Sequence, residues 1–199
     1  MKVKFNDFFL DRLHRNYWFL VLIFFCSACV PQDWRIRDQD PFSAEEHFNL
    51  GMTYAKGGKL DLAIQEYQAA YKNEPQNPEY GLTLGNAYSA MGQIEKAENI
   101  FKKLIRRHNH LGAKNNLAML YLHQKKKIEK AEILALEVAQ SDSPYRVFAL
   151  ETLADIYLLQ GKKSEALETI DKAMAMLSDK DESLYRILSQ KKNLIIEAD

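Results

Sequence analysis

The chain has 199 residues, and its 27 Lys and Arg are balanced by 27 Asp and Glu. A formal net charge of zero removes the electrostatic argument for a nucleic-acid partner or a polybasic membrane contact. With 47% hydrophobic residues, five Pro and eight Gly, the composition is that of a folded domain rather than a disordered linker. Both cysteines, Cys26 and Cys29, lie near the amino terminus, so packing rather than disulfides or thiolate-bound metal holds the remainder together.

The amino terminus combines a basic segment with an apolar run. Four bases and two acids in the first 16 residues precede an uncharged run that ends near residue 30. This is the n-region and h-region order of a secretory signal. Residues 17–30 span roughly 21 Å as a helix, which is short of the ~30 Å core of a bilayer. The pattern therefore favours a cleaved signal peptide over residues 1–28.

The apolar run ends in Cys26-Ser27-Ala28-Cys29. Small residues before a cysteine resemble the lipobox of bacterial lipoproteins, and this resemblance implies a lipid such as palmitate on Cys29. Val30 rather than Asp follows the cysteine, which by resemblance to enterobacterial sorting implies an outer-membrane anchor that faces the periplasm. Residues 29–42 are polar and bracketed by Pro, so we interpret them as a lipidated tether.

Two other interpretations of this segment stay open. A retained signal anchor would tether the chain to the inner membrane, because tilt and local thinning accommodate a short span. The same cysteines have the Cys-x-x-Cys spacing of a redox dithiol, although such a site needs a helix start inside a folded unit.

From residue 43 onward the sequence repeats itself. Three positions of the first unit recur 34 residues later in the second: Leu50 and Leu84, Tyr54 and Tyr88, Ala63 and Ala97. Two further units follow, with the cores Leu117-Ala118-x2-Tyr121 and Leu153-Ala154-x2-Tyr157. The pattern resembles the tetratricopeptide repeat. The resemblance implies an all-α helical solenoid over residues 43–177, with about four helix–turn–helix repeats near 43–77, 78–110, 111–144 and 145–178.

The pattern predicts eight helices in the repeats, near 43–56, 60–73, 77–91, 94–107, 110–124, 128–140, 144–160 and 163–177. Residues 179–199 follow, and an apolar stripe there predicts a ninth helix: Leu184, Ile187, Leu188, Leu194 and Ile195. We expect this helix to cap the last repeat, since a solenoid must cover its terminal apolar surface. A docking element for a partner is the alternative.

The sequence contains no recognisable catalytic motif and implies no cofactor. His108-Asn109-His110 offers two imidazoles but no third metal ligand near in sequence, so a solvated turn between helices is favoured over a metal site. Gly161-Lys162-Lys163-Ser164 lacks the upstream glycine and strand of a phosphate-binding loop. Lys125-Lys126-Lys127 is interpreted as an exposed turn.

Resemblance to the family implies that the first helices of successive repeats line a concave groove. The positions assigned to this lining are Phe48, Met52, Leu82, Asn86, Asn115, Met119, Leu122, Glu151, Asp155 and Leu159. These faces carry no Lys or Arg, which disfavours the clamp for a carboxylate that chaperone-type arrays use. We expect instead an extended or helical protein segment with apolar anchors and a basic end. The alternative is that Phe48, Leu82 and Met119 fill space between helices.

These features together favour a noncatalytic adaptor that holds an envelope protein or peptide segment and is joined to the membrane by its lipid. The architecture resembles outer-membrane lipoproteins of type IV pilus biogenesis, which help a secretin ring to assemble, and also polysaccharide-export lipoproteins and adaptors that recruit peptidoglycan enzymes. An inner-membrane-tethered periplasmic chaperone is the main alternative. An enzyme would have to use Glu151 and Asp155, the one candidate pair of titratable groups in the groove.

Overall fold

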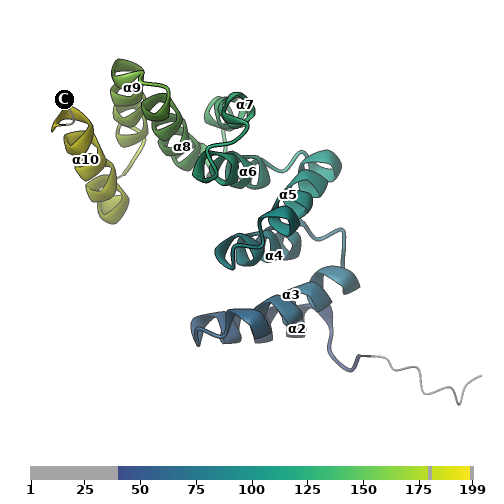
Figure 1. Cartoon of the computed structure of the whole chain (residues 1–199). Coiled ribbons are helices and arrows are strands. Elements are labelled where there is room, and N and C mark those ends of the chain that lie inside the picture. The colour runs from purple at the N-terminus through teal and green to yellow at the C-terminus, as the bar shows by residue number, and fades with distance from the viewer. Residues whose placement is uncertain (1–39, 179–180, 198–199) are drawn as a thin grey trace, which may run out of the picture. The chain divides into compact units, whose positions relative to one another are not determined.

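The structure is a computed structural model that describes residues 40–178 and 181–197. The chain divides into two units, Met1–Pro41 and Phe42–Asp199. The predicted signal peptide, Cys29 and most of the predicted tether lie outside the described residues. Within the described part of the second unit there are nine helices and no strand (Figure 1).

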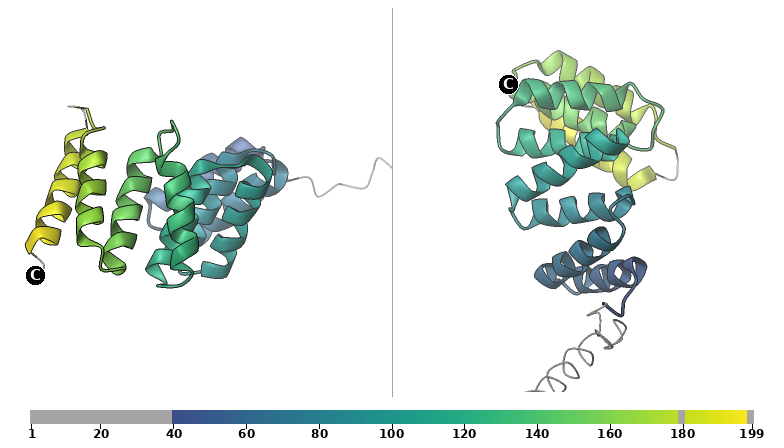
Figure 2. Two further views of the ribbon diagram at one scale, coloured as in Figure 1. Left: turned by 90° about the horizontal axis from the view of Figure 1, so that it is seen from above. Right: turned by 90° about the vertical axis from the view of Figure 1, so that its right-hand side faces the viewer.

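The helices follow one another as antiparallel pairs. Each of the pairs α2–α3, α4–α5, α6–α7 and α8–α9 packs closely, each pair contacts the next, and α10 packs on α9 (Figures 1 and 2). The bounds are α2 Ala44–Lys56, α3 Leu60–Asn73, α4 Pro78–Ala90, α5 Ile94–His108, α6 Leu111–His123, α7 Ile128–Ala139, α8 Arg146–Leu159, α9 Lys163–Met174 and α10 Glu182–Glu197. The predicted all-α solenoid of helix–turn–helix repeats with a final capping helix is confirmed.

Local sequence signals account for where the helices begin. Ser43 and Glu46 form a reciprocal capping box at α2, in which the Glu46 N–H donates to Ser43 Oγ over 3.2 Å and the Ser43 N–H donates to Glu46 Oε2 over 2.7 Å. Asn77 caps α4 just before Pro78, whose missing N–H is harmless at a first helical position. The last repeat helix, which the sequence predicts to end at residue 177, ends at Met174. The residues after Met174 form the tighter i to i+3 hydrogen bonds instead.

The turns inside the repeats depend on one residue in the left-handed region. Gly58, Gly92 and Gly161 have φ of 72°, 69° and 75°. The third repeat has no glycine there, and Lys125 takes the same place with φ 51°: its N–H donates to the carbonyl of Leu122, three residues back, as the glycines do. Lys127 is also left-handed, with φ 55°. Left-handed backbone costs a non-glycine residue about 1–3 kcal/mol, so this is the least favourable of the four turns.

The two helices of a repeat approach closely at a small residue. A Cβ atom at Gly51 would lie 2.6 Å from the ring of Tyr67, and one at Gly85 would lie 2.5 Å from the ring of Phe101. Both rings are almost fully buried. Ala118 and Ala154 take the equivalent positions in the third and fourth repeats and are fully buried. The small residue and the ring together set how closely the two helices of a pair pack.

Helix α10 covers only part of the last repeat. Leu188 and Ile195 are buried in one apolar cluster with side chains of α7, α8 and α9, including Ile170. Ile187 and Leu194, which belong to the same predicted stripe, are 50% and 67% exposed. The stripe is therefore wider than the surface that it covers.

We expect Gly85→Ala to lower the free energy of unfolding by about 1–2 kcal/mol, because overpacking against Phe101 outweighs the gain in helix propensity. The measurement is urea unfolding followed by circular dichroism. Gly57→Ala is the matched control, since a Cβ atom there meets nothing closer than 3.5 Å. Equal stability of the two variants would show that the approach at Gly85 is not a tight one.

Candidate functional site

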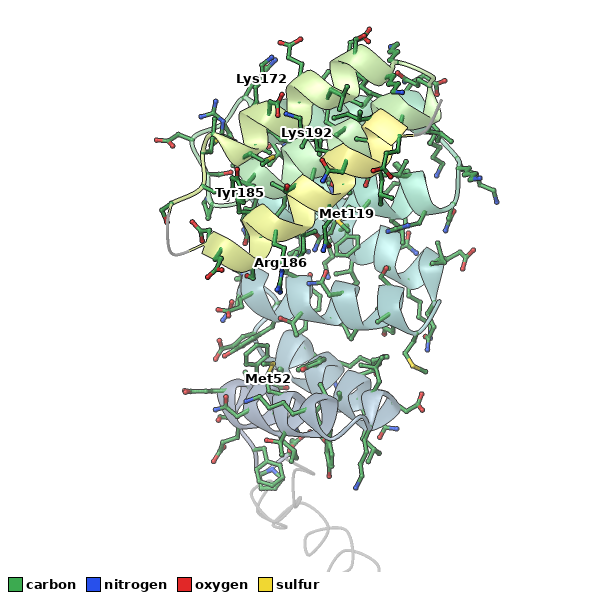
Figure 3. The ribbon with its side chains drawn as sticks, turned by 90° about the vertical axis from the view of Figure 1, so that its left-hand side faces the viewer. Met52, Met119, Lys172, Tyr185, Arg186 and Lys192 are labelled. Carbon is green, nitrogen blue, oxygen red and sulfur yellow. The ribbon has the colours of Figure 1, made fainter. Side chains whose placement is uncertain are left out.

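The first helices of three repeats line one hollow of about 530 Å³, which we name the inner groove. Its lining comes from α4, α6, α8 and α10: Leu82, Asn86, Asn115, Asn116, Met119, Leu122, His123, Tyr145, Phe148, Glu151, Thr152, Asp155 and Lys191. A second hollow, of about 500 Å³ between α4 and α6, shares four of these residues and extends the groove. Met119 and Met52 lie on the face of the repeats that is turned to the viewer in Figure 3.

The structure brings together seven of the ten residues that the sequence assigned to the groove: Leu82, Asn86, Asn115, Met119, Leu122, Glu151 and Asp155. The other three lie elsewhere. Phe48 packs against Tyr67 and Tyr80, with ring centroids 5.7 and 4.9 Å apart, so it fills space between helices as the alternative supposed. Met52 and Leu159 are partly exposed but do not line this hollow.

The two asparagines singled out by the sequence have different environments. Asn86 is exposed, and its Oδ1 accepts a hydrogen bond of 2.6 Å from Nδ2 of Asn116. Asn115 is only 3% exposed, and its Oδ1 accepts from Oγ1 of Thr152 over 3.3 Å. The amide pair that a partner can reach is therefore Asn86 with Asn116, whereas Asn115 joins α6 to α8.

The exposed apolar side chains of the groove are Met119 and Phe148, at 39% and 46%. Sequence reasoning missed Phe148. The signal was present, because Phe148 precedes Glu151 by three residues and Thr152 by four, which places all three on one face of α8. Exposed large apolar groups in a concave site provide anchors for a partner segment.

The acidic end of the groove is occupied by a cation of the chain itself. Nζ of Lys191 on α10 donates to Glu151 Oε1 over 2.8 Å and to Asp155 Oδ2 over 2.9 Å. Burial alone would lower the pKa of Lys191, but the hydrogen bonds to the two carboxylates outweigh it and raise the pKa above its usual value. The expected absence of Lys and Arg concerned the faces of the first helices of the repeats; Lys191 enters the groove from α10, which lies outside the repeats and whose placement could not be read from the period.

This lysine changes what the groove can recognise. Its ammonium is held by two carboxylates, so it does not act as a clamp for the carboxylate of a partner. Both acids pair with this one ammonium, which offsets only one of their two charges, so a basic end of a partner still matches this end of the groove, whereas the case for a free acid–base pair is weaker. The remaining recognition elements are the amide pair and the apolar side chains.

One histidine of the α5–α6 turn, His110, has a structural role. Nδ1 of His110 accepts from the N–H of Ala113 over 3.1 Å and caps α6, and burial lowers the pKa of His110. Within residues 40–178 and 181–197, no group of three or more His, Cys, Asp or Glu is placed to hold a metal ion. Gly161 is a repeat turn, as its positive φ shows.

We expect Lys191→Met to lower the free energy of unfolding by about 1–2 kcal/mol near pH 7, because two partly buried carboxylates lose their shared cation. The raised pKa of Lys191 means that its contribution is complete below its unfolded pKa near 10.5 and is lost as pH rises through the higher folded value. Urea unfolding from pH 7 to 11 measures both.

Lys192→Met is the control on the same helix. Lys192 pairs over 2.6 Å with Asp171, whose side chain is 53% exposed, and pairs of this kind contribute about 0.5 kcal/mol or less. A loss in Lys191→Met no larger than in Lys192→Met would contradict a special role for Lys191.

Comparisons with known proteins agree with this architecture. Residues 54–110 match the tetratricopeptide repeat family, and no curated protein sequence matches the chain. A thermophilic tetratricopeptide protein of Thermus thermophilus has a similar structure, with 21% identity, a TM-score of 0.59 and coverage of 67% of this chain and 74% of that one.

Two proteins of the type IV pilus system are also similar in structure. PilF of Pseudomonas aeruginosa is 21% identical, with a TM-score of 0.60 and coverage of 66% of this chain and 60% of PilF. PilW, a type IV pilus biogenesis factor, is 17% identical, with a TM-score of 0.61 and coverage of 66% of this chain and 61% of PilW. The chain spans less than two thirds of either pilus protein. Residues 54–110 match the tetratricopeptide repeat by sequence, and the described residues share the all-α solenoid fold of the tetratricopeptide protein compared above.

Proposed function

We propose that this protein is a noncatalytic adaptor that holds a segment of a cell-envelope protein in its inner groove. The tetratricopeptide fold is typical of scaffolds for protein–protein interaction. The observation that carries the proposal is the inner groove itself, in which an exposed amide pair lies among exposed apolar side chains. This combination suits a peptide better than it suits a small polar substrate.

The chemistry of the groove favours an extended segment. Asn86 and Asn116 together offer amide donors and acceptors, which match the N–H and C=O groups of a peptide backbone. Met119 and Phe148 supply apolar contact for large side chains of the partner. Since Lys191 already pairs with Glu151 and Asp155, a basic residue of the partner would share these two carboxylates with it.

The proposal includes an outer-membrane lipid anchor on Cys29 that faces the periplasm. It rests on the apolar run and the small residues before Cys29. No helix in the described part of the chain is both long and apolar enough to cross a membrane. The machine that we propose is one assembled in the envelope, such as a type IV pilus secretin or a polysaccharide-export complex, and the likeness in fold to PilF and PilW supports the former.

We expect Asn86→Ala with Asn116→Ala to weaken capture of the partner by about 1–3 kcal/mol, because polar backbone groups of the bound segment lose their hydrogen bonds. The measurement is in-cell photocrosslinking from position 119, followed by quantitative mass spectrometry of the crosslinked proteins. Asn73→Ala with Asn99→Ala is the matched control, because both asparagines are exposed and lie outside the groove. We expect to recover a pilus or export subunit, and we expect the groove variant, but not the control variant, to reduce the amount recovered.

Two outcomes of that experiment contradict the proposal. Unchanged crosslinking in the groove variant would place the contact elsewhere on the repeats. A broad set of unrelated secreted proteins would favour the alternative, a tethered periplasmic chaperone.

We expect the mature chain to begin at Cys29 with acyl groups attached and to require detergent for release from membranes. Intact-mass measurement of the purified protein checks this. Cys29→Ser is expected to abolish acylation, whereas the control Cys26→Ser leaves it intact. If the wild-type chain retains residues 1–28, the proposed lipid anchor is contradicted and an inner-membrane signal anchor is favoured.

A further inference from the structure

A second hollow, of about 360 Å³, lies between the second helices α5 and α7. We name it the outer basic groove. Its floor is formed by Leu117 and Tyr121 of α6. At 100° per residue these two positions lie on the face of α6 opposite to Met119, which lines the inner groove. The outer basic groove is therefore distinct from the site proposed above.

One wall of this groove carries an unusually exposed apolar residue. Ile133 on α7 is 64% exposed. It contributes little to the core, where Ala131 and Ala135 of the same helix are fully buried. An exposed isoleucine beside an apolar floor is the arrangement that receives a large side chain from a partner.

Four cations surround this apolar hollow: Lys102, Arg106, Lys127 and Lys130. Lys102 and Lys127 share one carboxylate, that of Glu98, over 2.7 and 2.6 Å. Burial raises the pKa of Glu98, but hydrogen bonds from Lys102, Lys127 and Tyr121 outweigh it and lower the pKa to about 2. Glu98 is thus fully committed and leaves the groove with an excess of positive charge.

The other two cations have no carboxylate of their own within the described helices. No ion pair joins Arg106 or Lys130 to an acid of the described chain. Two acids of α7 lie one turn from Ile133 on this face: Glu137, which pairs with the buried ammonium of Lys114, and the exposed Glu129, which forms no ion pair with a described residue. The positive charges of Arg106 and Lys130 are therefore available to pair with carboxylates of another protein.

This charge is not a general property of the repeats. The corresponding hollow one repeat later, between α7 and α9, is lined by two acids, Glu165 and Glu168, and two bases, Arg146 and Lys172, and Lys172 pairs with Glu168. The two hollows share their place in the repeat, but the charges that line the later one are balanced, whereas the only charged residues that line the one between α5 and α7 are cations. The cations between α5 and α7 are therefore a feature of this one site.

We propose that the outer basic groove is a second docking site, for a protein segment in which a large apolar side chain is flanked by carboxylates. The apolar side chain enters the hollow between Ile133 and the floor. A carboxylate on one side pairs with the guanidinium of Arg106, which suits bidentate contact, and one on the other side pairs with Lys130. The hollow shape favours a peptide over a membrane surface, because the apolar floor lies below the cations instead of protruding beyond them.

The test uses the full-length protein in detergent and short fluorescent peptides. Each probe has Phe, Leu, Ile or Trp at its centre, flanked on both sides by Asp and Glu. The comparison peptides replace the acids with Asn and Gln, or replace the central residue with Ser. Fluorescence anisotropy is expected to show binding of at least one acidic–apolar peptide that is about tenfold or more tighter than that of its two comparison peptides.

Variants then locate the binding. Arg106→Glu with Lys130→Glu is expected to weaken it about tenfold or more, and Ile133→Asn to weaken it severalfold. The matched control is Lys56→Glu with Lys72→Glu, which makes the same change in net charge at two exposed lysines of α2 and α3 and leaves binding within about twofold. Asn86→Ala with Asn116→Ala is also expected to leave it unchanged, so failure here is distinguishable from failure of the inner groove.

Three outcomes overturn the proposal. One is that none of the four acidic–apolar peptides binds more tightly than its comparison peptides. Another is that the two pairs of charge reversals weaken binding equally, which would indicate unspecific attraction. The third is that only vesicles of phosphatidylglycerol and phosphatidylcholine bind in a way that depends on Arg106 and Lys130, which would make the site a membrane contact.

Discussion

The close approach of the two helices in each repeat is the constraint on which the rest of the structure depends. A small residue on the first helix faces a large ring or aliphatic group on the second, as Gly51 faces Tyr67 and Gly85 faces Phe101. This contact fixes the distance and rotation of each pair, and its 34-residue spacing in the first two repeats carries the same geometry forward. Both candidate sites follow from it. The first helices present their remaining faces to the inner groove, and the second helices leave hollows between them on the other side.

Helix α6 links these two surfaces. Eight of its 13 residues are buried, so it has no wide solvated face. Met119 points into the inner groove, while Leu117 and Tyr121 form the floor of the outer basic groove. The helix is packed on both sides, so one element forms part of both surfaces. The chain therefore has the geometry of an adaptor that can contact two partners through one rigid element.

The sequence alone predicts the fold well because the residues that repeat are the ones that pack between the helices. The eight described helices of the repeats, α2 to α9, lie within three residues of their expected bounds, and the largest difference, at the end of α9, reflects i to i+3 hydrogen bonds that no periodicity reveals. The site is predicted less completely. Asn86 and Met119 follow from the resemblance to the family, and Phe148 was available from its spacing to Glu151 and Thr152 on α8. Lys191 was not, because α10 belongs to no repeat. The outer basic groove forms only where the faces of α5 and α7 meet. The run of lysines at residues 125–127 does not by itself predict this meeting.

The position of Lys191 decides how the two surfaces differ in selectivity. At the inner groove, the chain's own ammonium offsets one of the two negative charges of Glu151 and Asp155, so discrimination there rests largely on amides and apolar contacts. Amides that pair with a peptide backbone are indifferent to most side chains of the partner. At the outer basic groove, Arg106 and Lys130 remain uncompensated by any described acid, so charge decides which segment binds. A tolerant site and a charge-selective site on opposite faces of α6 would let one adaptor hold a variable segment while it recognises a specific one.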